Sequence, residues 1–96
     1  MEIDLRFFAT FRDAVGEKDR THAFDDDATV GNVLAALEAE YDGLEGQLLE
    51  DGEDGVAIRP QLSVLKNGRD VVHMAGVETE LDSGDRLSVF PPVAGG

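Results

Sequence analysis

The stretch Thr29-Val-Gly-Asn-Val-Leu-Ala-Ala-Leu-Glu-Ala-Glu-Tyr41 is the clearest helix in the sequence. Its apolar residues recur at spacings of three, four and seven, which places them on one stripe of a helix. This stripe consists of Val30, Val33, Leu34, Leu37 and Tyr41. Thr29 is a good N-cap, because its hydroxyl can accept a hydrogen bond from the first turn. We therefore expect one amphipathic helix, with Gly43 as its stop.

Strand patterns lie on both sides of this helix. On the N-terminal side, Ile3, Leu5 and Phe7 alternate with charged residues, which is typical of a half-buried strand. Residues 9–16 then predict a short helix, and residues 20–24 predict a second strand that pairs with the first.

The C-terminal half adds further strands. Residues 62–66 form a strand pattern, Asn67-Gly68 is a strong tight-turn signal, and residues 71–74 are expected to return as a strand. Residues 87–90 form the last strand, and the acidic residues 50–55 are expected to form a loop. The sequence thus predicts an α+β domain in which a mixed sheet packs on one main helix.

The composition excludes several function classes. The chain has 96 residues, with 21 Asp and Glu against 8 Lys and Arg, a net charge of −13. Such a surface repels phosphate groups, so neither nucleic acid nor an anionic membrane is an expected partner. Cysteine is absent, which excludes disulfides and thiolate metal sites. No apolar run is long enough to span a membrane, and we expect a cytoplasmic protein.

The acidic excess also predicts a halophilic protein. Like charges on a small body repel each other in dilute buffer, and molar salt screens that repulsion. An acidic protein adapted to low salt is the alternative explanation.

No active site with its own nucleophile and base is evident in the sequence. His22 and His73 have no acid or nucleophile at a recognisable spacing. The run 25–27 is an acidic loop rather than a cation site, and the 51–55 loop lacks the EF-hand ligand pattern. We therefore expect no enzyme activity, no metal and no bound cofactor.

The C-terminal segment is the most informative part of the sequence. Pro91-Pro92 ends the last strand and projects the next residues away from the sheet as a stiff arm. The tail Val93-Ala-Gly-Gly96 follows. Glycine has no Cβ, so such a tail fits a narrow channel and lets a nucleophile approach the terminal carboxylate. That carboxylate is unreactive until another enzyme activates it. The alternative interpretation is a frayed terminus without a function.

The segment from Leu81 to Gly96, with its Gly-Asp, Phe-Pro-Pro-Val and Gly-Gly elements, resembles the ending of MoaD-type sulfur carriers and of the ubiquitin-like small archaeal modifier proteins of haloarchaea. Residues 5–16 and 28–30 are also similar to that family. The resemblance implies a β-grasp fold with four to five strands on one main helix. It implies a folded domain over residues 1–92 and a flexible tail over residues 93–96.

The resemblance also implies the chemistry. A ubiquitin-activating-type enzyme would use ATP in trans to adenylate Gly96. The activated carbonyl would then form an isopeptide bond with a target lysine, or would become a thiocarboxylate for sulfur transfer. Two alternatives remain open. One is a dedicated sulfur carrier that works as the small subunit of molybdopterin synthase with the large subunit as partner. The other is a non-covalent interaction module.

Three groups of residues follow as candidate sites besides Gly96. The activating enzyme is expected to recognise the tail, which consists of Pro91, Pro92, Val93, Ala94 and Gly95. A partner surface is expected on the exposed face of the sheet at Phe8, Leu62, Val64 and Phe90, although alternation predicts that some of these are buried. The only side-chain acceptors for self-conjugation are Lys18 and Lys66, which could equally be ordinary surface charges.

Overall fold

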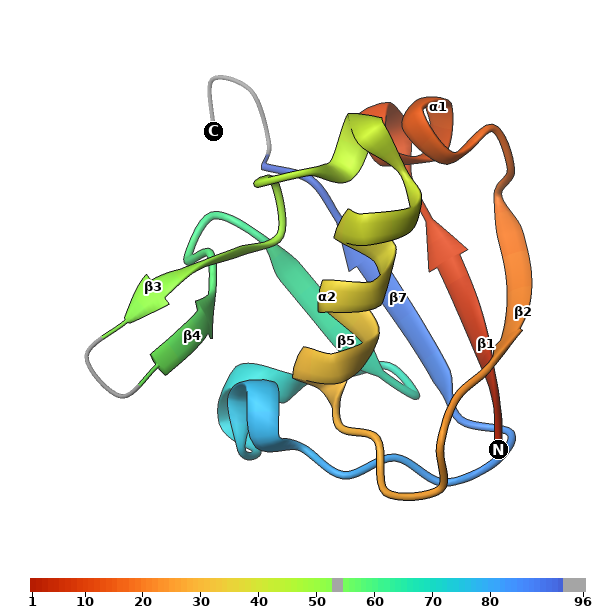
Figure 1. Ribbon diagram of the computed structural model, residues 1–96, viewed down its shortest axis with the longest axis vertical. Coiled ribbons are helices and arrows are strands. Elements are labelled where there is room, and N and C mark those ends of the chain that lie inside the picture. The colour runs from red at the N-terminus through yellow and green to blue at the C-terminus, as the bar shows by residue number, and fades with distance from the viewer. Residues whose placement is uncertain (53–54, 93–96) are drawn as a thin grey trace.

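The computed structural model describes residues 1–52 and 55–92 and contains a mixed five-stranded sheet of order β2-β1-β7-β5-β6. The strands are β1 (Glu2–Phe7), β2 (Asp19–Ala23), β5 (Ser63–Lys66), β6 (Arg69–Asp70) and β7 (Arg86–Phe90). The central pair, β1 and β7, is parallel, and every other pair in this sheet is antiparallel. The α+β prediction of a mixed sheet on one main helix is confirmed (Figure 1).

The main helix α2 (Val30–Glu40) lies across one face of this sheet. Thr29 caps it as predicted: its Oγ1 accepts from the Asn32 N–H at 3.4 Å, and the Asn32 side chain accepts from the Thr29 N–H at 2.9 Å. The helix ends at Glu40, before the predicted stop at Gly43, because Tyr41 has an extended backbone. Gly43 lies in a short 3₁₀ turn, η1 (Asp42–Leu44).

Gly43 allows η1 to pack against the first helix, α1 (Ala9–Val15). A Cβ at Gly43 would come within 2.7 Å of the Ala14 Cβ, which is closer than side-chain carbons approach each other in real structures. Helix α1 ends as predicted at Gly16, whose φ of 86° is in the left-handed region that glycine tolerates.

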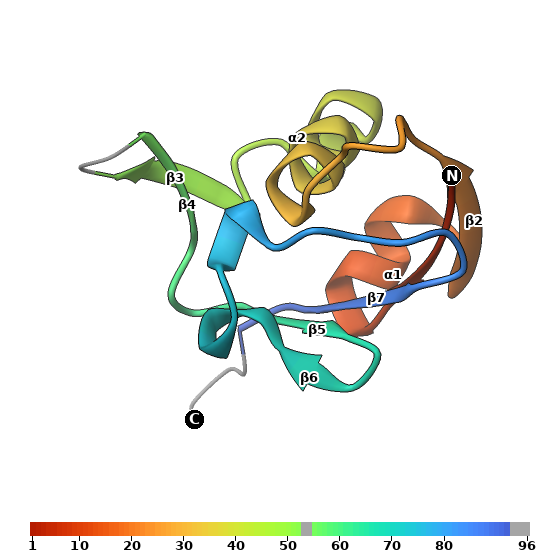
Figure 2. The ribbon, with the colours of Figure 1, turned by 90° about the horizontal axis from the view of Figure 1, so that it is seen from below.

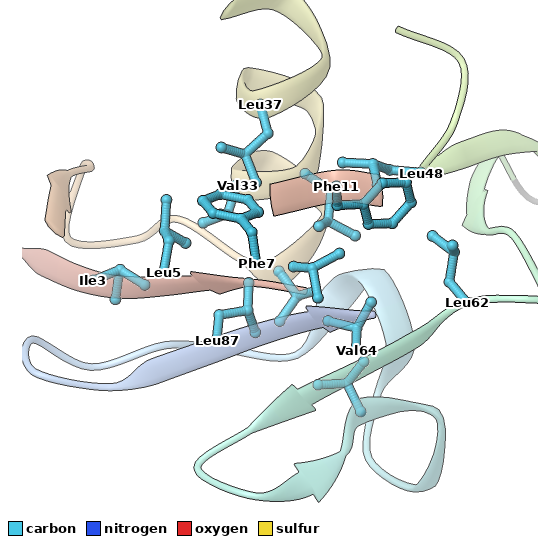
Figure 3. Packing of buried hydrophobic residues seen from close by; sticks show 14 of the residues in the cluster. Ile3, Leu5, Phe7, Phe11, Val33, Leu37, Leu48, Leu62, Val64 and Leu87 are labelled. Atoms are coloured by element: carbon cyan, nitrogen blue, oxygen red, sulfur yellow. The ribbon is translucent and has the colours of Figure 1, made fainter. Parts of the chain in front are cut away.

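The hydrophobic core lies between the sheet and these helices (Figure 3). The predicted alternation in β1 is confirmed, because Ile3, Leu5 and Phe7 are fully buried. From β7, Leu87 and Val89 point to the same side. Four apolar side chains of α2 cover them, and they are Val30, Val33, Leu34 and Leu37. Within the described residues, no helix is long and apolar enough to cross a membrane.

Two sequence predictions were wrong. The first was the loop at residues 50–55, because β3 (Leu49–Gly52) and β4 (Gly55–Ile58) form an antiparallel hairpin. Its strands expose most of their side chains, so acidic residues are tolerated there and the alternation that identifies a strand is missing.

The second was the strand predicted at residues 71–74. Strand β6 stops at Asp70, and a 3₁₀ turn, η2 (Val71–His73), follows, with another, η3 (Gly76–Glu78), farther along. The reason is a cap: the Asp70 carboxylate accepts from the Val72 N–H at 3.0 Å, which bends the chain away from the sheet.

Candidate functional site

The strand that leads to the C-terminal tail occupies the middle of the sheet. β7 pairs with β1 as far as Val89 and with β5 as far as Phe90, so the end of the strand is held between two neighbours. Pro91 is half-buried and Pro92 is exposed. The tail positions Val93, Ala94, Gly95 and Gly96 lie outside the described residues, so their predicted roles and the predicted boundary at residue 92 stay predictions.

We call the face of the five-stranded sheet opposite α2 the outer face; α1 and α2 lie on the other side (Figure 2). The positions of β1 and β7 that alternate with the core residues lie there, and these are Glu2, Asp4, Arg6, Arg86, Ser88 and Phe90. The parallel register pairs Phe7 with Val89, so the next residues, Phe8 and Phe90, are also neighbours. Their rings stack with centroids 4.1 Å apart and planes 7° apart. An aromatic platform thus lies on the outer face at the base of the tail.

A hollow of about 460 Å³ lies on the outer face beside this platform, lined in part by Phe8, Ser88 and two arginines. Each arginine is held by a neighbouring carboxylate. The Arg6 Nε lies 3.0 Å from the Asp19 Oδ1, and the Arg86 Nε lies 3.6 Å from the Asp4 Oδ2. The outer face therefore combines stacked aromatic rings with paired charges. Sequence reasoning missed the arginines, although their alternation with core residues would have placed them there.

The predicted partner surface needs a correction. Leu62 and Val64 are only 9% and 1% exposed and belong to the core, as Figure 3 shows. Val64 pairs with Val89 in register, so both side chains lie on the α2 side of the sheet. Of the four predicted residues, only the half-buried Phe8 and Phe90 reach the outer face.

A polar cluster holds the start of β7. The Asp85 Oδ2 accepts from the Asp82 N–H at 2.8 Å, and its Oδ1 accepts from the Asn67 amide at 3.0 Å. The Lys66 Nζ lies 3.7 Å from the same carboxylate. Burial alone would raise the pKa of Asp85, but these hydrogen bonds and the Lys66 charge outweigh burial and lower that pKa. The carboxylate is therefore held ionised where the central strand begins.

The two lysines have different environments. The Lys66 Nζ donates to the Glu80 carbonyl at 3.0 Å besides its contact with Asp85. Lys18 is exposed in the connection between α1 and β2, and its own carbonyl accepts from the Phe7 N–H at 2.9 Å. The Lys18 backbone is therefore fixed while its side chain extends into solvent.

Within the part of the chain that the structure describes, His22 and His73 do not belong to a catalytic group. The His22 Nδ1 lies 3.7 Å from the Glu40 Oε2, and its ring stacks on Phe24. His73 is exposed in η2. Among residues 1–52 and 55–92, no three His, Asp or Glu side chains are grouped as a metal site would need.

The chain has a central strand that is followed by a Pro-Pro stem and a sequence ending in two glycines, and one face of its sheet is open. This arrangement agrees with the family model that matches residues 5–96, which is that of the ThiS family. The chain belongs to the ThiS family. The predicted resemblance to sulfur carriers and small archaeal modifiers is thereby confirmed.

Three relatives extend the ThiS family assignment. Small archaeal modifier protein 3 of Haloferax volcanii is 64% identical over 96 residues, which cover 100% of both chains. A putative sulfur carrier protein of Archaeoglobus fulgidus is 45% identical over 67 residues, 68% of this chain and 72% of the relative. The solution structure of a Haloferax volcanii protein matches with a TM-score of 0.89 and 62% identity, over 100% of this chain and 87% of the other. The β-grasp prediction is confirmed by this match.

Proposed function

We propose that this protein is a ubiquitin-like modifier and sulfur carrier whose reactive group is the Gly96 carboxylate. The observation that supports it best is the position of β7: the central strand of a β-grasp sheet ends at Phe90, four uncharged residues follow Pro91-Pro92, and the family match extends to residue 96. The relatives named as modifier and sulfur carrier match the chain over two thirds or more of its length.

The chemistry divides between this chain and an activating enzyme. One Gly96 oxygen attacks the α-phosphorus of ATP, pyrophosphate leaves, and an acyl-adenylate forms. A lysine amine of a target protein then attacks the carbonyl carbon, which gives an isopeptide bond, AMP and a proton. If a sulfide-level donor attacks instead, the products are a thiocarboxylate and AMP. This chain contributes the carboxylate, a tail without bulky side chains and the docking surface; ATP stays with the partner enzyme.

The docking surface supports an enzyme partner. We assign it to the Phe8–Phe90 platform and the neighbouring hollow of the outer face, because these lie where the tail leaves the sheet. An enzyme that holds this face would be positioned to receive the residues after Pro92. Stacked aromatic rings are suited to such contacts, because they combine a large apolar area with little conformational freedom.

The test is reconstitution with the activating enzyme, ATP-Mg²⁺ and either sulfide or a lysine-bearing target. Intact-mass spectrometry should show one oxygen of Gly96 replaced by sulfur, or a branched peptide that joins Gly96 to lysine. A chain without Gly95-Gly96 should form neither product while it keeps its fold. Conjugates that persist without these two residues would exclude the tail chemistry, and a full-length chain that binds the enzyme but forms neither product would favour the non-covalent module.

A second reconstitution separates the two covalent roles. A dedicated molybdopterin synthase subunit would give thiocarboxylate but no lysine linkage when target proteins are supplied. A modifier would give both products.

A further inference from the structure

The hairpin strand β4 has an unpaired edge. Its only strand partner among the described residues is β3, and the Arg59 N–H donates to the Leu48 carbonyl at 3.0 Å in the same register. In an antiparallel pair, alternate residues direct their backbone groups to the partner strand. The N–H and C=O groups of Ala57 therefore point to β3, whereas those of Val56 and Ile58 point away from β3. Within the described chain these outward groups have no backbone partner.

An apolar groove runs beside this strand. A hollow of about 300 Å³ is lined by Val56, Ala57 and Ile58 on the β4 side, and by η2 and η3 residues on the other. The η2 and η3 residues are Val72, Ala75, Gly76 and Val77. Val56 is 51% exposed and Val72 is 69% exposed, two of the largest such values among the described large hydrophobic side chains. The outward N–H and C=O groups of β4 thus lie beside a groove that can take apolar side chains.

The charges around the groove indicate what kind of segment binds there. Glu78 lines the adjoining hollows, and β3 carries the exposed carboxylate of Asp51, while that of Glu50 lies 4.0 Å from the Arg59 Nη1. No Lys or Arg lines any of these hollows in the described chain. A second copy of this protein would bring another acidic hairpin and another net charge of −13 to the same place. An extended segment with cationic flanks is therefore the better complement.

We propose that β4 and this groove bind an extended segment of a partner protein, which adds as a third strand to the β3–β4 hairpin. The segment has uncharged, strand-forming residues in its centre and Lys or Arg at its flanks. This recognition uses main-chain hydrogen bonds for affinity and side-chain pockets for specificity. The site is independent of the Gly96 chemistry, so it would serve a free or a conjugated modifier alike.

The probe is the synthetic peptide Arg-Lys-Val-Thr-Val-Thr-Arg, capped at both ends, titrated into the ¹⁵N-labelled full-length protein. The amide signals of Val56 and Ile58 should shift and gain protection from hydrogen exchange. A peptide methylated on every backbone nitrogen cannot donate hydrogen bonds from either edge of a strand and should not bind. A peptide with Glu at the flanks should bind more weakly, compared at the lowest salt that preserves the native circular dichroism spectrum.

Two variants at one position give a matched pair. Val56→Pro removes an outward N–H but leaves the bonds to β3, so it should weaken binding about tenfold or more. Val56→Thr keeps that N–H and should bind within about threefold of the unmodified protein. Unchanged amide signals of the five-stranded sheet show that both variants are folded.

Three results would overturn the proposal: equal binding of the N-methylated peptide, equal binding of Val56→Pro, or shifts confined to the outer face. If the Val56 and Ile58 signals changed with protein concentration in the absence of peptide, the occupant would be a second copy, which also contradicts it. Each of these readouts is independent of the Gly96 reconstitution.

Discussion

Phe8 and Phe90 stack almost parallel, with ring centroids 4.1 Å apart, and so join the end of β1 to the end of β7. These two residues are 82 positions apart in the sequence (90 minus 8) but adjacent in the parallel register. The contact fixes the point at which the chain leaves the sheet towards its tail.

Alanine substitutions of this pair should separate stability from docking. Phe8→Ala and Phe90→Ala should each destabilise the fold, and a double-mutant cycle should give a coupling energy of about 0.5–1.5 kcal/mol, because a stacked aromatic pair contributes that much beyond its buried area. Urea unfolding measures the coupling. Both variants should also raise the KM for adenylation, whereas Thr10→Ala, at an exposed position of α1, should not. Unchanged adenylation in the doubly substituted protein would remove the platform from the docking surface.

Self-conjugation, if it occurs, should use Lys18. The Lys66 Nζ donates to the Glu80 carbonyl and lies 3.7 Å from the Asp85 carboxylate, and its side chain is only 22% exposed, so an acyl donor reaches it less easily than the exposed Lys18. Lys18→Arg should abolish dimeric conjugates in the reconstituted reaction, and Lys66→Arg should leave them. Denaturing gels with reductant detect the dimeric conjugates, and linkage mass spectrometry identifies the acceptor lysine. A branched peptide at Lys66 in both the unmodified protein and Lys18→Arg would contradict the prediction that Lys18 is the acceptor.

Asp85 should make stability depend on pH in acid. Its folded pKa lies below the usual 3.8, so the native state binds fewer protons than the unfolded chain. Its contribution is therefore fully present above about pH 4 and is lost as the pH falls through the folded pKa. Asp85→Asn should cost about 1–3 kcal/mol near pH 7, and the difference from the unmodified protein should shrink below pH 4.

The measurement is urea unfolding at a series of pH values, with Asp82→Asn as the matched control. The Asp82 side chain is exposed, and its part in the cluster is its backbone N–H, which the control keeps. A difference that stayed constant between neutral and strongly acidic pH would show that the charge of Asp85 does not stabilise β7.

Salt should stabilise the fold. The screening length falls from about 10 Å at 0.1 M to about 3 Å at 1 M salt, which removes most of the repulsion among the surface carboxylates. The Tm measured by circular dichroism should therefore rise between these KCl concentrations. Replacing the exposed run 25–27 with asparagines should reduce that rise. The same Tm at both concentrations would exclude a halophilic adaptation.

The sequence predicted most of the sheet, because period-two alternation identifies a strand only when one face is buried. Ile3, Leu5 and Phe7 satisfy this condition and were placed correctly. The β3–β4 hairpin does not satisfy it, since Glu50 and Asp51 are exposed and only Leu49 and Ile58, at its base, pack against the core. The pairing of β3 with β4 is a contact between two segments, and the local composition of either segment does not predict it.

The candidate site was predictable at the level of chain order but not of side-chain direction. The Pro91-Pro92 stem and its place after the last strand follow from local sequence. Assigning Val64 to the outer face failed, because a strand's direction is set by its register with Val89 in β7. The partnership of Phe8 with Phe90 required knowing that β1 and β7 are parallel neighbours.

The central position of β7 has a consequence for biosynthesis. Residues 86–90 are made after every other described strand, yet they form the strand between β1 and β5. The sheet therefore cannot be completed while the nascent chain still lacks them, and an aborted chain would leave β1 without its parallel neighbour. The sheet therefore closes only after residue 90 has been made, and a chain that stops before this residue lacks both the completed sheet and the Phe8–Phe90 contact.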